Sequence, residues 1–346
     1  MANPNGITTR DPQEVAYFQQ LCKEHLKPDG TPNITQIAAI MGRSRLTLKA
    51  WPREANQTIE YPPFVMDGDP EEPIEELLAR RKTAFERKLK ASTDRKWFQV
   101  KVREQKPYGV LMFGDPHLDD DGCNYTLLDR HLSVARQDGI YGINIGDTTN
   151  NWTGRLMRLY AKQEASESQA KRLAEWFMFD AGVKWLCWIL GNHDDWNGGA
   201  DFHKRLGGGH IPIIDWRAQF EIAHPSGSTA RIDASHGRKG SSIWNNLHAT
   251  LRAAKLGELA DLYVTGHTHS FGLEDLEIPE RAMSCWLVQL RGFKFMDTYA
   301  LHNNFAEHQR GASVLAIIDP SKDARRTVMC FEDVEEGAEY LAWKRR

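Results

Sequence analysis

The chain has 346 residues, of which 41% are hydrophobic and 26% charged, and its formal net charge is −3. This length suits one large domain with a smaller appendage, and the core needs no covalent staples. Five scattered cysteines without a CxxC pair argue against a disulfide framework or a thiolate zinc site, and they favour a reducing, cytoplasmic location. The longest apolar stretch, residues 183–190, is far short of the roughly 20 residues that span a bilayer, so we expect no membrane partner.

Residues 1–57 are predicted to form a small all-α domain. Within it, residues 34–51 read ITQIAAIMGRSRLTLKAW, in which an apolar face is followed by Gly42 and then by a second apolar face that includes Leu48 and Trp51. Gly42 supplies the tight turn of a helix-turn-helix, and the small Ala38 lets the second helix cross closely. We expect Asn33 or Thr35 to cap the first helix and Ser44 the second.

This segment resembles the DNA-binding helix-turn-helix of transcription factors and phage packaging proteins. The resemblance implies that polar residues of the turn and second helix face a DNA groove or phosphates, namely Arg43, Ser44, Arg45, Thr47 and Lys49. The alternative is a plain helical hairpin used for packing or oligomerisation.

Residues 58–105 are predicted to be a linker that leads into a basic helix. The segment opens with Pro62 and Pro63 and passes through the acidic stretch at residues 67–76. Residues 79–106 then contain 11 Lys or Arg against 3 Asp or Glu. Such a switch in charge is typical of a linker and a solvated helix. A helix that follows a nucleic-acid backbone is the alternative.

Residues 106–320 are predicted to form an α/β domain, because short apolar runs alternate with longer amphipathic segments. A C-terminal tail, residues 321–346, is expected to pack on it. The apolar runs that we interpret as buried strands are Gly109–Phe113, Ile143–Ile145, Trp185–Leu190, Arg231–Ala234, Leu262–Val264, Trp286–Leu290 and Val314–Ile318.

Polar clusters follow the first five of these strands directly. They read GDPH, GDTTN, GNHDD, SHGRK and TGHTH, and a glycine stands immediately before the first Asp, Asn or His in four of them. A glycine allows a sharp exit from a strand and close approach of substrate to the backbone. Because α/β sheets build their sites at the carboxyl ends of strands, we expect the five clusters along one rim of a sheet.

Together the clusters offer ligands for metal ions. They contain two carboxylates, one amide and four imidazoles: Asp115, Asp147, Asn192, His117, His236, His267 and His269. This oxygen and nitrogen set has no thiolate, which suits Mn²⁺, Fe or Zn²⁺. Seven ligands are too many for one tetrahedral ion but suit two ions that share a carboxylate. We therefore expect two divalent cations, with Mn²⁺ as the first choice.

The clusters, in this order over residues 114–269, resemble the calcineurin-like metallophosphoesterase superfamily. The resemblance implies a two-sheet β-sandwich flanked by helices. It also implies that His193 acts as a general acid or orients the phosphate, and that Asp147 bridges the metals. The expected ligands of one metal are Asp115, His117 and His269, and those of the other are Asn192, His236 and His267.

One position departs from the family pattern. Many members have an Asp three residues after the bridging Asp, where it orients and charges the active-site histidine, whereas this chain has Asn150. An amide accepts a hydrogen bond but does not stabilise an imidazolium as a carboxylate does. We therefore expect His193 to be a weaker acid, with monoesters that have poor leaving groups as poor substrates. The alternative is that Asp194 or Asp195 compensates.

Basic side chains near the clusters are candidate phosphate ligands. Arg238 and Lys239 follow His236 directly and are expected to hold a non-bridging phosphate oxygen or the next phosphate of a chain. Ordinary surface charges are the alternative. A long helical insertion is predicted at residues 151–180, and its Arg155, Arg158 and Lys162 are expected to face solvent.

The predicted function is a dimetal-dependent phosphodiesterase that acts on nucleic acid, specifically a DNA nuclease. The architecture also resembles that of phage-encoded phosphoesterases. One alternative is a phosphatase or phosphodiesterase for a small phosphate ester, a cyclic nucleotide or a phosphoprotein. The other is a DNA-binding regulatory or assembly protein whose phosphoesterase fold is a non-catalytic scaffold.

Overall fold

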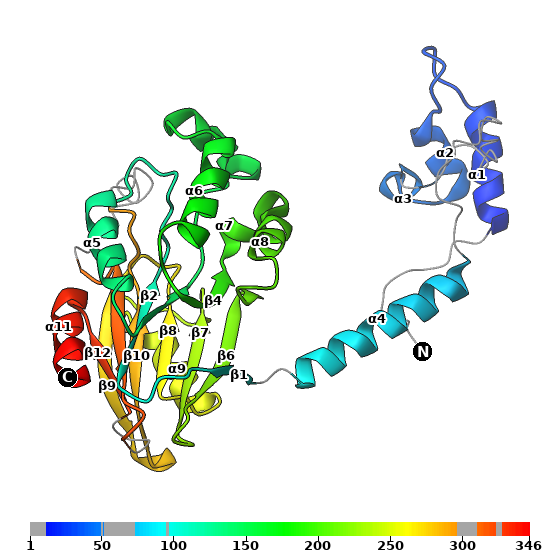
Figure 1. Cartoon of the computed structure of the whole chain (residues 1–346). Helices are drawn as coiled ribbons and strands as arrows, with labels where there is room; N and C mark the ends of the chain where they lie inside the picture. Colours follow the sequence, from blue (N-terminus) through cyan, green and yellow to red (C-terminus); the bar gives the residue numbers. More distant parts are fainter. Residues whose placement is uncertain (1–11, 50, 52–72, 95–96, 296–309, 323–326) are drawn as a thin grey trace. The chain divides into compact units, whose positions relative to one another are not determined.

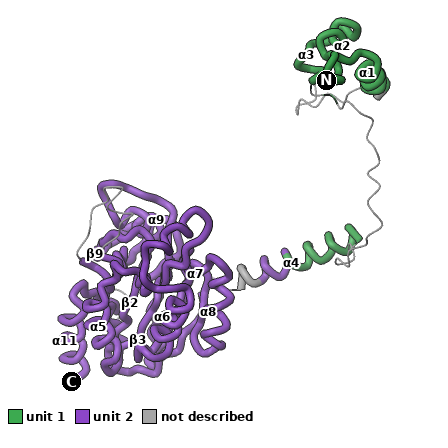
Figure 2. Tube along the Cα trace, turned by 90° about the horizontal axis from the view of Figure 1, so that it is seen from above, with its two compact units in different colours: residues 1–84 green, residues 85–346 purple. Residues whose placement is uncertain are grey.

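The computed structural model describes residues 12–49, 51, 73–94, 97–295, 310–322 and 327–346. The chain divides into two compact units, Met1–Ala84 and Phe85–Arg346 (Figure 2). Within the described ranges, no helix is long and apolar enough to cross a membrane. All five cysteines are free thiols. The first part of the predicted linker, residues 58–72, lies outside the described residues.

Three short helices make up the described start of the first unit. The side chain of Asn33 accepts a hydrogen bond from the backbone of Gln36 at 3.3 Å, which caps the second helix as expected. Gly42 ends that helix with a φ of 60°, in the left-handed region that glycine tolerates. The helices are α1 (Pro12–Glu24), α2 (Ile34–Met41) and α3 (Arg45–Lys49).

These helices share a small apolar cluster of their own. Phe18, Ile37, Leu48 and Trp51 are buried in it, and the rings of Phe18 and Trp51 meet edge to face with centroids 5.5 Å apart. The predicted pair of apolar faces around Gly42 is therefore present.

The predicted basic helix is present as α4 (Ile74–Asp94). Its described side chains, up to Lys90, are exposed except for the half-buried Leu77 and Ala84. A helix that is polar on most of its circumference is one that solvent surrounds. Both interpretations of the charge pattern, a solvated helix and a helix that follows a nucleic-acid backbone, require this exposure.

The second unit contains two six-stranded sheets, each of mixed strand direction (Figure 1). The first sheet has the order β12-β11-β2-β3-β4-β5 and the second has the order β1-β6-β7-β8-β10-β9. The first consists of β2 (Tyr108–Phe113), β3 (Ile140–Asn144), β4 (Trp185–Leu190), β5 (Ile213–Asp215), β11 (Ser313–Ile318) and β12 (Val328–Phe331). The second consists of β1 (Phe98–Lys101), β6 (Arg217–Ala223), β7 (Thr229–Ser235), β8 (Leu262–Thr265), β9 (Gly272–Ile278) and β10 (Met283–Gln289).

The sheets pack face to face, and helices cover their outer sides. Val110 and Ile189 of the first sheet share a buried cluster with Phe220 and Ile232 of the second. A second cluster joins the first sheet to its helices, and a third joins the second sheet to α9. This confirms the predicted sandwich flanked by helices. The helices are α5 (Tyr125–Ala135), α6 (Glu167–Phe179) and α11 (Val334–Arg345) on the first sheet and α9 (His248–Leu256) on the second.

All seven predicted strands are present, but their arrangement differs from the single rim that we expected. The first three lie in one sheet as β2, β3 and β4, whereas the next two lie in the other sheet as β7 and β8. The expectation was wrong because apolar runs alone do not say which strands pair. The polar clusters nevertheless meet. The strands β2, β3 and β4 run parallel in one sheet, β7 and β8 run parallel in the other, and the carboxyl ends of all five strands lie at the same site.

The predicted helical insertion at residues 151–180 is two elements instead of one. A 3-10 segment, η1 (Gly154–Lys162), precedes α6, and a capping box of Ser166 and Gln169 starts α6. The capping box breaks the apparent continuity, because it satisfies the free backbone N–H groups of a new helix. Arg155, Arg158 and Lys162 are exposed, as predicted.

A buried histidine in α5 predicts a pH dependence of stability. His131 lies 3.0 Å from Ser313 through its Nδ1, and burial lowers its pKa to about 4. In the unfolded chain this histidine has its ordinary pKa of about 6.5. Between pH 6.5 and pH 4 the unfolded chain therefore binds more protons than the folded state, so the free energy of unfolding decreases as the pH falls through this range. We expect His131→Asn to remove about 3 kcal/mol of the acid-induced loss in unfolding free energy. Urea unfolding of both proteins near neutral pH and near pH 4.5 measures this, and an identical pH dependence would contradict it.

Candidate metal centre

Donor atoms of four predicted ligands converge around His236, which follows β7. Its Nε2 lies 3.1 Å from Asn192 Oδ1, 3.1 Å from His267 Nδ1 and 3.2 Å from Asp147 Oδ2. Its Nδ1 donates to the carbonyl of Ile145 at 3.0 Å, which fixes the direction of the ring. Ligands of one small cation come this close to each other, and second-shell bonds to the other imidazole nitrogen orient metal-binding histidines in the same way.

The charge balance at His236 shows that this position attracts positive charge. Burial lowers the pKa of His236, but the carboxylates of Asp147 and Asp115 outweigh it and raise the pKa to about 9. The two carboxylates stabilise a proton on His236, and a divalent cation at this position would neutralise more of their charge.

A second group of donors lies beside the first. Ligand atoms of Asp115, His117 and His269 all lie within 4.8 Å of one another. His117 is buried, and its Nε2 has no hydrogen-bond partner among the described residues, while its Nδ1 faces Asn150 Oδ1 at 2.8 Å. Burial, with the charge of His193, lowers the pKa of His117 well below its ordinary value, so the ring is the neutral imidazole that a metal requires.

Asp147 stands between the two groups. Its Oδ2 lies 3.2 Å from His236 Nε2, 4.0 Å from His117 Nε2 and 3.9 Å from His193 Nε2. Burial alone would raise its pKa, but the positive charges of His236 and His193 hold the pKa below the ordinary aspartate value. By contrast, burial dominates at Asp115 and raises its pKa to about 8, although His236 opposes it. Each of these buried carboxylates disfavours the ionised form of the other. Divalent cations between them would allow both to be ionised.

The backbone at most of the candidate metal ligands has a positive φ angle. A non-glycine residue with positive φ is uncommon, and such conformations cost about 1–3 kcal/mol each. They persist where the surrounding structure requires a particular side-chain direction, which points to a functional site. Five of the seven predicted ligands are in this region: Asp115 (φ 42°), His117 (43°), Asp147 (52°), His267 (70°) and His269 (48°).

Two glycines leave room for the carboxylates. A Cβ on Gly191 would lie 2.1 Å from Asp147 Oδ1, and a Cβ on Gly266 would lie 2.4 Å from Asp115 Oδ2. Real Cβ contacts are not this short, so neither position accepts a side chain without moving a carboxylate. The sequence predicted that substrate approaches the backbone here, whereas the structure places the carboxylate of a candidate metal ligand against each glycine.

The residues fit two divalent cations. Asp115, His117 and His269 would hold one, and Asn192, His236 and His267 the other, with Asp147 between them. The donors are oxygen and imidazole nitrogen, a set suited to Mn²⁺, Fe or Zn²⁺.

His193 lies at the edge of this centre. Its Nδ1 donates to the main-chain carbonyl of Asn150, so Nε2 is the nitrogen left to act on a ligand at the centre. Its ring packs against Trp152 and Trp196, with centroids 5.2 Å and 4.3 Å away. The side chain is 13% exposed, which leaves it accessible from outside.

The expected role of Asn150 requires a correction. Its side chain contacts His117 instead of His193, and its Nδ2 donates to Asp120 Oδ2 at 2.8 Å. Lys294 lies 3.0 Å from the same carboxylate of Asp120. An amide suits this position because it accepts from one neighbour and donates to the other. Asn150 therefore orients a candidate metal ligand, and it reaches His193 only through its main chain.

This arrangement predicts that Asn150→Leu weakens metal binding. The apolar side chain neither accepts from His117 Nδ1 nor donates to Asp120, so the support of His117 is lost. We expect Mn²⁺ to bind about 10-fold more weakly, because loss of such outer contacts has effects of that size. Calorimetric titration with Mn²⁺ measures it, and unchanged or tighter binding would contradict this role of Asn150.

The basic residues predicted to bind phosphate differ in their surroundings. The Arg238 side chain is only 7% exposed and donates to Asp233 Oδ1 at 2.9 Å and to the Asp233 carbonyl at 2.7 Å. A guanidinium held in this way is not free to hold a non-bridging oxygen of a phosphate at the metal centre, which corrects that part of the expectation for Arg238. Lys239 is exposed and lines a cavity of about 390 Å³.

The residues predicted to contact DNA are exposed on the first unit. Arg43 pairs with Glu14 at 2.7 Å, and the backbone of Thr47 donates to Ser44 Oγ at 3.1 Å. Ser44 therefore caps α3, as expected, and Arg45 and Lys49 face solvent.

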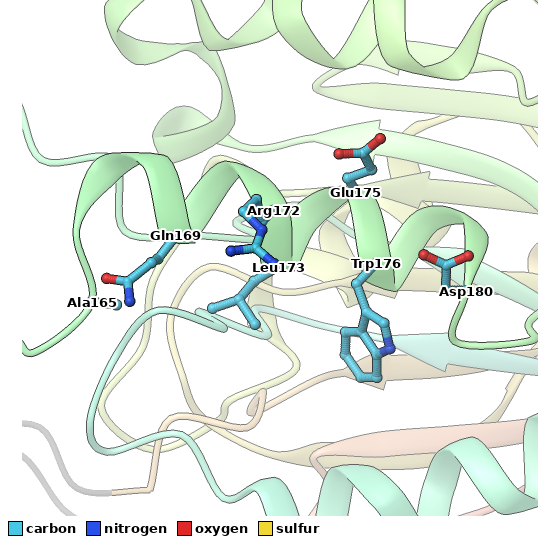
Figure 3. Close-up of a pocket in the computed structure, with 7 residues that line it drawn as sticks. All are labelled: Ala165, Gln169, Arg172, Leu173, Glu175, Trp176 and Asp180. Carbon is cyan, nitrogen blue, oxygen red and sulfur yellow. The ribbon is translucent and has the colours of Figure 1, made fainter.

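A larger cavity of about 560 Å³ lies along α6, and none of the candidate metal ligands lines it (Figure 3). It is lined by Ala165, Gln169, Arg172, Leu173, Glu175, Trp176 and Asp180.

Comparison with solved structures finds proteins of phosphoesterase type. Calcineurin-like phosphoesterase YfkN from Bacillus subtilis is 10% identical with a TM-score of 0.35, covering 70% of this chain and 100% of its own. A metallophosphoesterase from Sphaerobacter thermophilus is 16% identical with a TM-score of 0.33, covering 68% and 97%. A predicted phosphoesterase from Streptococcus pneumoniae TIGR4 is 12% identical with a TM-score of 0.32, covering 66% and 99%. No protein-family model and no curated protein matches this chain.

Proposed function

We propose that this chain is a dimetal-dependent phosphodiesterase that hydrolyses nucleic acid, with DNA as its substrate. The observation that supports it most is the convergence of buried donors on two adjacent positions that share Asp147. A purely structural role does not account for an unpartnered buried His117 Nε2 or for strained backbone at five ligand positions.

When bound, a pair of divalent cations supplies activation of a water nucleophile and neutralises charge at phosphorus. The chain itself contributes the geometry. His193 Nε2 faces the centre beside Asp147, where it can donate a proton to the leaving oxygen of the ester. Trp152 and Trp196 hold the His193 ring from its sides, and the carbonyl of Asn150 fixes its tautomer.

Two features support nucleic acid as the substrate. The first unit presents the exposed Arg45 and Lys49 on α3, and α4 carries exposed basic side chains over much of its length. Lys and Arg arrayed on exposed helices are the electrostatic signature of phosphate-backbone binding. Both features lie outside the metal centre, so they bear on substrate size and not on the chemistry.

Turnover assays with Mn²⁺ test both parts of this proposal. We expect hydrolysis of bis(p-nitrophenyl) phosphate, slower hydrolysis of the matching monoester, and cleavage of linear or circular DNA. Cleavage of DNA should weaken steeply between about 50 and 200 mM salt, whereas the small diester should respond little. If the folded protein hydrolyses no phosphodiester with Mn²⁺, Fe or Zn²⁺, the enzyme proposal is wrong, and the alternative of a non-catalytic scaffold is favoured. Diester hydrolysis without DNA cleavage would favour a small substrate.

A further inference from the structure

A basic cavity adjoins the metal centre on the side of His236 and His267. Its volume of about 390 Å³ is within the range of small-ligand sites. The wall nearest the centre is Trp216, whose ring lies edge-on to His236 and His267 with centroids 5.1 Å and 6.0 Å away. Gly237, next to the ligand His236, lines it as well. Trp216 and Gly237 are therefore shared between the lining of this cavity and the surroundings of the ligands His236 and His267.

Four cationic side chains line the cavity, and no described residue that lines it is acidic: the cations are Arg217, Arg238, Lys239 and Arg252. Asp233 is the counter-charge to two of them, because it binds both Arg217 and Arg238. No ion pair to Lys239 or Arg252 occurs among the described residues. The cavity thus has an excess of positive charge, and the largely buried Arg238 Nε has no hydrogen-bond partner in the described part of the chain.

Trp216 is held out at the rim of this cavity under strain. Its φ is 58°, which is a genuine outlier for a bulky residue, and the residue stays 44% exposed. Its backbone bridges the two sheets, since its N–H donates to Leu190 and its carbonyl accepts from His236. An exposed indole fixed in one direction beside basic side chains is a platform on which a base or sugar can rest.

We propose that this cavity binds a second phosphate of the substrate, the one next to the phosphate that reacts at the metal centre. Lys239 and Arg252 are its cations, Arg217 and Arg238 add fixed positive charge, and Trp216 supports the group between the two phosphates. This inference rests on the proposed function, because it places the reacting phosphate at the metal centre. Such a second phosphate belongs either to a polynucleotide strand or to a nucleoside polyphosphate.

Calorimetric binding to the full chain with Mn²⁺ tests this without relying on turnover. The probes are thymidine 5′-monophosphate, the 5′-phosphorylated dinucleotide pdTpdT and adenosine diphosphate. Arg252→Glu is compared with Lys255→Glu, which makes the same charge change on the exposed face of α9 but outside the cavity lining. We expect a two-phosphate probe to bind the wild type at least about 10-fold more tightly than the monophosphate, and Arg252→Glu to abolish that gain. Lys255→Glu should keep it.

Each outcome decides the proposal. If Arg252→Glu loses the gain in affinity for pdTpdT alone, the cavity binds the second phosphate of a nucleotide strand. If it loses the gain for adenosine diphosphate alone, the cavity binds the second phosphate of a polyphosphate. If it loses the gain for both probes, the cavity binds a second phosphate from either source. Equal binding by Arg252→Glu and Lys255→Glu, or no gain in the wild type, overturns it. Hydrolysis of bis(p-nitrophenyl) phosphate by the same wild-type protein is measured in parallel. If that hydrolysis fails while the binding difference stands, the proposed function is lost and the phosphate site remains.

Discussion

Asp147→Asn is expected to lower kcat/KM for a chromogenic phosphodiester by at least about 1,000-fold, which corresponds to about 4 kcal/mol of transition-state stabilisation. Among the described residues, Asp147 is the one carboxylate that forms a donor group with His236 and His267 and another with His117 and His193. The amide keeps the shape of the side chain but not its charge, so both groups of ligands lose their common anion. The measurement is steady-state hydrolysis of bis(p-nitrophenyl) phosphate at several Mn²⁺ concentrations.

The matched control is Asp129→Asn, an identical change at an exposed position on α5. It should keep activity within about twofold of wild type, because exposed changes away from special features have small effects. Circular dichroism and thermal melting must show that Asp147→Asn is folded. Residual activity above about a tenth of wild type in folded Asp147→Asn would contradict the role of Asp147 as the shared ligand.

Asp233→Ala is expected to lower the free energy of unfolding by about 3–5 kcal/mol. Asp233 is fully buried in β7, and it accepts from Arg217 at 2.9 and 2.7 Å and from Arg238 at 2.9 Å. Burial would raise the pKa of Asp233, but the two guanidinium groups hold it below the ordinary value. Removing the carboxylate leaves the guanidinium of Arg238 buried without its counter-charge.

Urea unfolding at neutral pH measures this effect. Asp215→Ala is the comparison, because Asp215 forms an exposed pair with Lys204 at 3.0 Å and should cost less than about 1 kcal/mol. The double variant Asp233→Ala/Arg238→Met should recover part of the loss, since it no longer buries an unpaired charge. A loss for Asp233→Ala as small as that for Asp215→Ala would show that this buried pair does not matter to stability.

The residues that bring chemistry to the centre could be predicted because each stands at the end of a strongly apolar strand. One glycine separates Asp115 from β2 and His267 from β8, and two residues separate Asp147 from β3. Hydrophobic periodicity and flanking glycines reveal such strand ends. The weaker strands β1, β5, β6, β9 and β12 were missed. In β6, for example, buried and exposed residues alternate, which is a fainter signal than a continuous apolar run.

The contacts around the ligands could not be predicted, because they join residues far apart in sequence. Asp120 supports Asn150 from a different loop, and its carboxylate also binds Lys294. Asp194 is an intermediate case. It accepts from the backbone of Gly191 and of Thr148, and its place three residues after Gly191 is the usual position of a helix-capping acid, a signal the sequence did contain.

Arg238 shows why proximity in sequence misleads. It lies two residues after the ligand His236, yet the side chain turns back to Asp233 in β7. Because β7 ends at Ser235, the alternation of a strand does not set the direction of Arg238, and the buried carboxylate of Asp233 captures its guanidinium. Arg252 in α9 had no sequence signal, and only the packing of α9 on the second sheet brings it to the same cavity.

The number of divalent cations bound per chain tests the central claim most directly. Equilibrium dialysis of the full chain against Mn²⁺, followed by elemental analysis, should give two ions per chain for the wild type, as a shared-carboxylate centre requires. His269→Ala, which removes a ligand from the group with Asp115 and His117, should bind one ion with wild-type affinity and lose the other. Folded wild-type protein that binds one ion or none, or His269→Ala protein that still binds two with unchanged affinity, would contradict the account.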